Sequence, residues 1–69
     1  MMDGDRLRVL RLARGMSLDE LALATNSIVS KQMLSRYERG QSMPTPRVIT
    51  ALAKALGVPI SRLFEGSLF

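Results

Sequence analysis

Residues 29–46, VSKQMLSRYERGQSMPTP, decide the fold of this sequence. Ser30 is a typical helix N-cap and Gly40 a typical C-terminal stop, so the stretch predicts a helix that begins at Lys31 and ends at Gly40. On a helical wheel its hydrogen-bond donors fall within one arc of about 140°. Leu34 and Tyr37 lie on the opposite side, which we expect to pack on a core. The residues of this donor arc are Lys31, Gln32, Ser35, Arg36 and Arg39.

The donor arc contains no carboxylate, whereas a plain solvated helix face usually mixes acids and bases. Lys, Arg, Gln and Ser are the side chains that hydrogen-bond to base edges in the major groove of DNA. The pattern therefore indicates a surface that contacts DNA. A charged face that only keeps the protein in solution stays open as the alternative. Glu38, the one acid of this helix, falls at the edge of the apolar side.

Helix start and stop signals continue on both sides of this stretch. The segment Ser17-Leu18-Asp19-Glu20 is a capping box, and Thr45-Pro46 supplies an N-cap followed by proline at the first helical position. Gly15 and Gly57 each follow an apolar periodic segment, and strand patterns are poor. The sequence predicts an all-α fold of five short helices, over residues 5–14, 18–24, 31–40, 46–56 and 59–65.

The first predicted helix carries an arginine beside its apolar side. We assign that side to Leu7, Val9, Leu10 and Ala13, and Arg11 falls next to Leu7 at its edge. A guanidinium group in that place needs a carboxylate partner, because an unpaired charge is costly to bury.

Composition narrows the possible functions. The 69 residues predict one domain, with a disordered start over residues 1–4 and a tail over residues 66–69. Cysteine and histidine are absent, which removes disulfides, thiolate zinc sites and the commonest general base, so we expect no enzyme, metal or other cofactor. The net charge of +4 and the pI of about 10.8 are compatible with nucleic acid as a partner, and equally with a basic domain whose charges have no particular role. Without a membrane-length apolar run or a signal peptide, we expect a cytoplasmic, nucleoid-associated protein of prokaryotic or phage origin that binds no membrane.

Three runs together resemble a known family. They are LRVLRLARGMSLDELA (7–22), VSKQMLSRYERGQSMPTP (29–46) and ITALAKALGVPISRLF (49–64), and they look like the Cro and lambda-repressor-like class, the XRE helix-turn-helix family. The motifs ARG-x-S-x-x-E-L-A, S-R-Y-E-R-G and L-A-K-A-L-G-V are specific only in combination, and the likeness covers about residues 5–65. It implies a lambda-repressor-like domain whose second and third helices form the helix-turn-helix, with residues 30–39 as the recognition helix.

The resemblance also implies the partners and the site. The partner is double-stranded DNA, bound through its major groove, and the protein is a transcriptional regulator for which the role of repressor is favoured. An ion pair between Arg11 and Glu38 is implied as well. The base-reading positions are Lys31, Gln32, Ser35 and Arg36, and the phosphate-binding positions are Ser17, Arg39, Gln41, Ser42 and Arg47.

A homodimer on a two-fold site is the usual arrangement for such domains. Candidate dimer contacts are the apolar residues near the end of the sequence, Leu63, Phe64, Leu68 and Phe69. No small-molecule substrate is evident.

Two features depart from the family pattern. The connection over residues 25–29 is about one or two residues longer than the usual three or four, and it lacks the expected glycine. Met33 occupies a position near the groove, where it either touches a thymine methyl or packs at the helix edge. Two other functions stay open: the N-terminal address module of a larger regulator, for example ahead of a metallopeptidase-like domain, and a protein-interaction domain that kept the fold without DNA binding.

Overall fold

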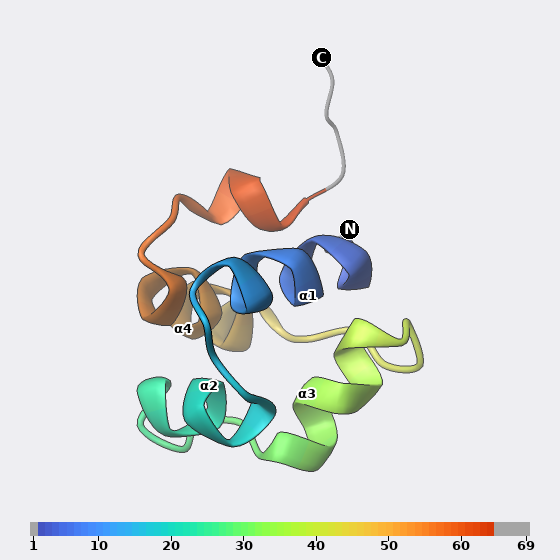
Figure 1. The fold of residues 1–69 in the computed structure, drawn as a ribbon. Coiled ribbons are helices and arrows are strands. Elements are labelled where there is room, and N and C mark those ends of the chain that lie inside the picture. Colours follow the sequence, from blue (N-terminus) through green and yellow to red (C-terminus); the bar gives the residue numbers. More distant parts are fainter. Residues whose placement is uncertain (1, 65–69) are drawn as a thin grey trace.

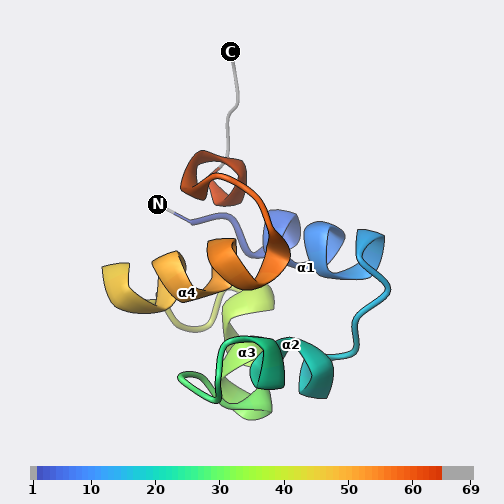
Figure 2. The same cartoon turned by 90° about the vertical axis from the view of Figure 1, so that its left-hand side faces the viewer.

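The computed structural model describes residues 2–64 of the chain. The predicted all-α architecture is confirmed over these residues, which form four α-helices and one 3-10 helix (Figure 1). In two perpendicular views η1 lies above α1 and α4, and α2 and α3 lie below them (Figures 1 and 2). The elements are α1 (Gly4–Ala13), α2 (Leu18–Ala24), α3 (Lys31–Glu38), α4 (Pro46–Leu56) and η1 (Ile60–Leu63).

Every element contributes to one core. Its fully inaccessible side chains are leucines, supplied by all four α-helices and by η1, and Val29 and Tyr37 close the core around them. Burial of such side chains is the main stabilising term in a domain of this size. The completely buried leucines are Leu7, Leu21, Leu34, Leu52, Leu56 and Leu63.

The prediction of a fifth α-helix over residues 59–65 is wrong. The segment is a 3-10 helix of four residues, and Phe64 is already extended. Phe64 forms an isolated antiparallel bridge with Met2, and the Asp3 amide donates to the Leu63 carbonyl at 2.9 Å. This backbone pairing holds Phe64 in an extended conformation directly after Leu63, so the helical turn ends there.

The prediction of a disordered start is wrong for residues 2–4. Met2 is 5% exposed and belongs to the core. The Asp3 carboxylate caps α1 by accepting a hydrogen bond from the Asp5 amide at 3.0 Å, and Gly4 begins the helix. A core side chain and an N-cap therefore anchor this segment.

Helix α1 buries only part of the predicted apolar side, because Leu7 is in the core and Leu10 packs against it while Val9 and Ala13 do not. Leu7 and Arg11 are buried, four residues apart on one helical row, whereas Val9 is 62% exposed and Ala13 is also exposed. The polar partners of Arg11 lie inside the molecule, and the helix turns that row toward them. The distribution of apolar residues on the helical wheel, taken alone, predicts that Val9 is buried in the core.

The longer connection between α2 and α3 reaches its turn without glycine. Asn26 and Ser27 both adopt left-handed backbone conformations, with φ values of 59° and 61°. Asparagine tolerates this region better than most residues, and the Ser27 amide donates to the Ala22 carbonyl at 3.1 Å. The chain thus reverses sharply, Val29 enters the core at 4% exposure, and Ser30 reaches its capping position.

Gly4 allows the start of α1 to touch the end of α3. A Cβ built at this position would collide with the Tyr37 carbonyl oxygen and lie 2.7 Å from the Glu38 carbonyl oxygen. Both are backbone atoms, which cannot move aside without shifting α3. The closest contact between these helices therefore depends on the absence of a side chain.

We expect Gly4→Ala to lower the free energy of unfolding by about 1–3 kcal/mol, the usual effect of overpacking. Chemical denaturation measures the change. Arg8→Ala, an exposed substitution on the same helix, is the control and should stay within about 0.5 kcal/mol of the parent. A Gly4→Ala protein at least as stable as the parent would show that α1 and α3 do not meet this closely.

Candidate nucleic-acid interface

Helix α3 presents the donor arc to solvent. Lys31, Gln32, Arg36 and Arg39 are exposed and Ser35 is half-buried, while the opposite face inserts its apolar side chains into the core. The five donor-arc residues, together with Leu18 from the first turn of α2, line one surface hollow of about 370 Å³. The structure therefore brings all four predicted base-reading residues to one place.

The ends of α3 are set by local hydrogen bonds. Ser30 caps the helix by accepting from the Met33 amide at 3.2 Å, and Arg39 is the C-cap, so the helix ends two residues before the predicted Gly40. Met33 is half-buried and packs against the core, which favours the helix-edge role over contact with a base.

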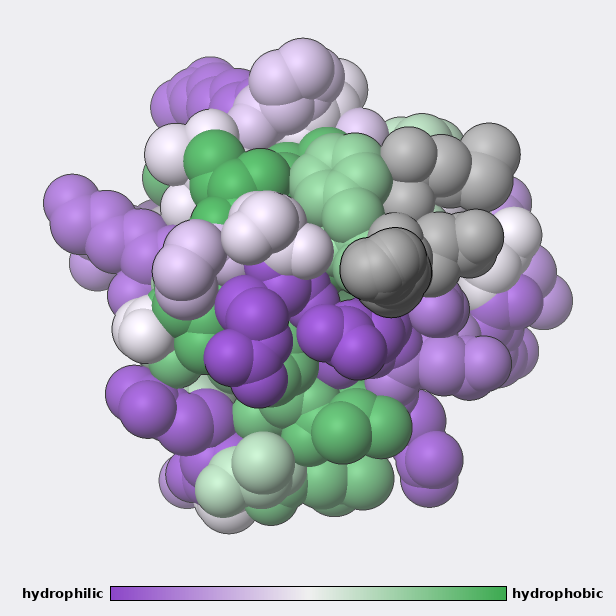
Figure 3. Space-filling model, turned by 90° about the horizontal axis from the view of Figure 1, so that it is seen from above, coloured by the Kyte–Doolittle hydropathy of each residue, from purple (hydrophilic) through white to green (hydrophobic). Residues whose placement is uncertain are grey.

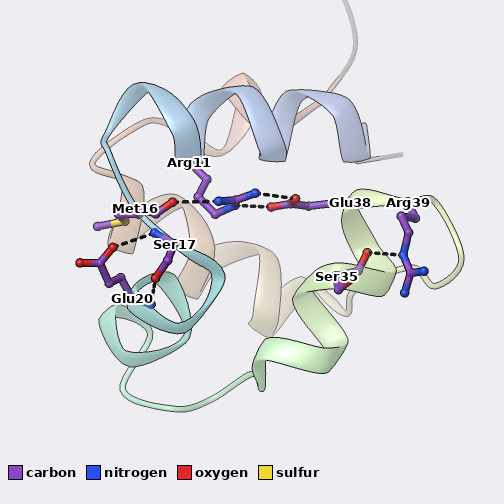
Figure 4. A network of polar contacts seen from close by, with 7 residues as sticks. All are labelled: Arg11, Met16, Ser17, Glu20, Ser35, Glu38 and Arg39. Atoms are coloured by element: carbon purple, nitrogen blue, oxygen red, sulfur yellow. Dashed lines mark hydrogen bonds and ion pairs between the residues drawn. The ribbon is translucent and has the colours of Figure 1, made fainter.

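The first turn of α2 reaches the donor arc, because Leu18 lines the same hollow and Asp19 lies near Lys31. The predicted capping box at this helix start is confirmed (Figure 4). The Glu20 amide donates to Ser17 Oγ at 3.0 Å, and the Ser17 amide donates to Glu20 Oε1 at 2.7 Å. Ser17 is exposed at this positive end of the helix dipole, a position suited to a phosphate group.

One acidic residue at this edge was missed by the sequence interpretation. The Asp19 carboxylate lies 3.6 Å from the Lys31 ammonium, with side-chain exposures of 70% and 51%. Such an exposed pair contributes little to stability, but it offsets part of the positive charge where α2 meets α3. The sequence contained a signal for this pair: Asp19 lies in the first turn of α2, and Lys31 lies in the first turn of the next helix.

Arg11 connects α1 to α3 and to the α1–α2 connection (Figure 4). Its Nε donates to Glu38 Oε2 at 2.7 Å and its Nη2 to Glu38 Oε1 at 3.0 Å, forming a two-point ion pair. Its Nη1 donates to the Met16 carbonyl at 2.8 Å. The two charged side chains are only 10% and 7% exposed. The structure thus contains the ion pair expected at Arg11 and Glu38.

The hydrogen bond to Glu38 raises the pKa of Arg11 above its ordinary value, and burial opposes the rise only in part. A raised pKa in the folded state means that the stability linked to the charge of Arg11 is lost only when the pH rises above the ordinary arginine pKa. The cation therefore stays charged throughout the usual pH range of proteins.

The predicted phosphate-binding residues do not form one cluster. Arg39 lies in the donor-arc hollow, where its Nε donates to the Ser35 carbonyl at 3.3 Å. Gln41 and Ser42 follow α3 in the connection to α4. Arg47 lines a separate hollow of about 680 Å³ between α4 and the α2–α3 turn.

The predicted dimer contacts need correction. Leu63 is completely buried in the core of its own chain, and half-buried Phe64 packs against that core, so Leu63 cannot meet a second copy. Leu68 and Phe69 lie outside the described residues. The face that carries η1 and α1 nevertheless exposes hydrophobic areas (Figure 3), and the exposed large apolar side chains of these elements are Val9, Leu12 and Ile60.

Within residues 2–64, no helix is long and apolar enough to cross a membrane. Across the same residues, no group of acidic side chains is arranged to hold a metal ion.

Comparison with known proteins decides the family. The sequence profile of the family described as Helix-turn-helix matches residues 7–63, nearly the whole described chain. The chain belongs to this helix-turn-helix family. Its resemblance to the Cro and lambda-repressor-like (XRE) class is thereby confirmed, and its fold is the DNA-binding fold of helix-turn-helix transcriptional regulators.

Individual helix-turn-helix relatives agree with this placement. The HTH-type transcriptional regulator SutR of Escherichia coli (strain K12) is 47% identical over 55 residues, covering 80% of this chain and 30% of SutR. The restriction-modification controller protein C.AhdI from Aeromonas hydrophila superposes with a TM-score of 0.82 at 36% identity, covering 88% of this chain and 89% of C.AhdI. The BldD DNA-binding domain of S. venezulae gives a TM-score of 0.79 at 29% identity, with 90% of each chain covered. The chain spans only 30% and 56% of the curated relatives it matches.

We expect Arg11→Ala to destabilise this helix-turn-helix domain by about 3–5 kcal/mol, because the substitution leaves the Glu38 carboxylate buried without its cation. Thermal and chemical denaturation measure the loss. Lys31→Ala breaks the exposed pair with Asp19 and serves as the control, with an expected change below about 1 kcal/mol. Equal melting temperatures for Arg11→Ala and the parent would contradict the buried pair.

Proposed function

We propose that this chain binds double-stranded DNA in a sequence-specific manner, as the DNA-binding domain of a transcriptional repressor. One observation carries the proposal: the exposed face of α3 is a row of hydrogen-bond donors without an acid of its own. The only acid of the helix, Glu38, is turned inward and neutralised by Arg11. A face of this kind has a surplus of donors that suits the acceptor-rich surface of a duplex.

The docking follows from the arrangement of α2 and α3. We place α3 in the major groove, where Lys31, Gln32, Ser35 and Arg36 reach base edges. The N-terminus of α2 at Ser17 then faces the phosphate backbone, whose charge its amide groups and dipole attract. Phosphate contacts from Arg39, Gln41 and Arg47 supply most of the affinity, and base contacts supply discrimination.

The relatives support this function. SutR is described as a transcriptional regulator, C.AhdI as a controller protein and the S. venezulae domain as DNA-binding. The chain covers 30% of SutR, which favours a second form of the same proposal, an address module within a larger regulator. Any further activity would then belong to residues outside this chain.

We further propose that the domain acts as a homodimer in the cytoplasm, where bacterial and phage DNA lies. A single recognition helix contacts few base pairs, and two-fold symmetry doubles the site. Val9, Leu12 and Ile60 are exposed apolar side chains that a partner protomer could cover.

Salt dependence of binding tests the function. We expect fluorescence anisotropy with generic duplex DNA to show a logarithm of the binding constant that falls linearly with the logarithm of salt concentration. Arg47→Ala should weaken every duplex about equally and reduce the slope by roughly one unit. Arg62→Ala changes the charge by the same amount on η1, which lies on the far side of the molecule from α3, and should leave the slope unchanged (Figures 1 and 2).

A parent slope indistinguishable from zero would favour the protein-interaction domain instead. Equal effects of Arg47→Ala and Arg62→Ala would show that the slope reports only net charge and that α4 does not contact the backbone of the duplex.

A further inference from the structure

The connection after α3 folds back onto the last turn of the helix. Gly40 takes a left-handed conformation with a φ of 73°, which a side chain would disfavour. The Gly40 amide donates to the Tyr37 carbonyl at 3.1 Å, and the Gln41 amide donates to the Arg36 carbonyl at 2.9 Å. These two bonds fix the direction of the chain, and they bring the half-buried Ser42 back beside Arg36.

At that point the two side chains meet. Arg36 Nε donates a hydrogen bond to Ser42 Oγ at 3.0 Å, across six residues. Ser42 is neutral, so it orients the guanidinium group without cancelling its charge. The bond also decides which part of the group stays available. Because Nε is engaged, the two terminal nitrogens, with their four N–H groups, form the free end of the fork.

The other cations near α3 are held differently. Arg11 is buried, and each of its three guanidinium nitrogens donates to an acceptor inside the protein, so it is not presented to a ligand. Lys31 faces the Asp19 carboxylate. Arg39 donates its Nε to a carbonyl of its own helix at 3.3 Å. Arg36 differs from these cations because its guanidinium group is held by a side-chain hydroxyl, that of Ser42, which lies outside the helix.

The free end of the Arg36 fork matches one base edge. Guanine presents O6 and N7 side by side in the major groove, and a paired contact from arginine needs two parallel N–H groups at that spacing. An arginine already fixed at Nε loses less side-chain freedom when it makes this contact. A loose arginine would contact phosphates and bases with less preference.

We propose that Ser42 is a positioning residue that presents the terminal nitrogens of Arg36 to a guanine, and that Arg36 makes the domain specific for a G·C pair at one position of its site. The inference rests on the proposed DNA-binding function. It replaces the phosphate contact predicted for Ser42 with a role in base discrimination.

The test starts by selecting duplexes from a randomised pool with the full chain and measuring, by competition, the preference for each base at each enriched position. Arg36→Ala should lose a guanine preference at one position by about 10- to 100-fold. Ser42→Ala should lower the preference at that same position by roughly 3- to 10-fold, as expected for one lost hydrogen bond. Its affinity for generic duplex and its salt slope should equal those of the parent.

Two further variants isolate the positioning role. Ser42→Thr keeps the hydroxyl and should retain the guanine preference of the parent. Ser42→Ala added to Arg36→Ala should cause no further loss, because the hydroxyl then has nothing to orient. In the free protein, the Arg36 Nε proton should exchange with water faster in Ser42→Ala than in the parent.

Three outcomes would overturn the inference while leaving the proposed function standing: uniform weakening of all duplexes by Ser42→Ala, which indicates a phosphate contact; an unchanged guanine preference in Ser42→Ala; or a preference other than guanine at the position that depends on Arg36. A parent chain that shows no salt-dependent binding to any duplex would overturn the proposed function itself, and this inference with it.

Discussion

The ion pair between Arg11 and Glu38 is the constraint on which the rest of the structure depends. A buried guanidinium group is tolerated only when its donors have acceptors, and those of Arg11 lie on two separate parts of the chain. The Glu38 carboxylate is on α3 and the Met16 carbonyl is in the α1–α2 connection. Satisfying both at once fixes how α1 sits against the helix-turn-helix unit. A purely apolar contact could slide or rotate with much less loss.

The same pair shapes the surface that faces solvent. Turning Glu38 inward removes the only acid of α3 from the exposed side and leaves the donor arc without a negative charge of its own. On the neighbouring helix α2, the Asp19 carboxylate lies beside Lys31. At the other end of the helix, Gly40 turns the chain so that Ser42 reaches Arg36. The orientation of α3 therefore determines both which side chains enter the core and which charges face solvent.

Local signals in the sequence predicted local structure well. The bounds of α2 and the start of α4 follow from caps and proline placement, which act within one helical turn. The errors concern features that depend on distant partners. The exposure of Val9 depends on where Arg11 finds its acceptors, and the short η1 depends on the pairing of Phe64 with Met2. In the candidate site, the helical periodicity of the sequence predicted the donor arc. The hydrogen bond from Arg36 to Ser42 could not be predicted in this way, because it depends on the turn of the backbone after α3.

We expect the exposed face of α3 and the N-terminus of α2 to form the DNA-binding surface. Backbone amide chemical shifts, followed by NMR while duplex DNA is added to the isotope-labelled chain, test it most directly. The largest changes should fall in residues 17–20 and 30–42, with η1 unaffected. Changes centred on η1 and the outer face of α1, with α3 unchanged, would contradict it.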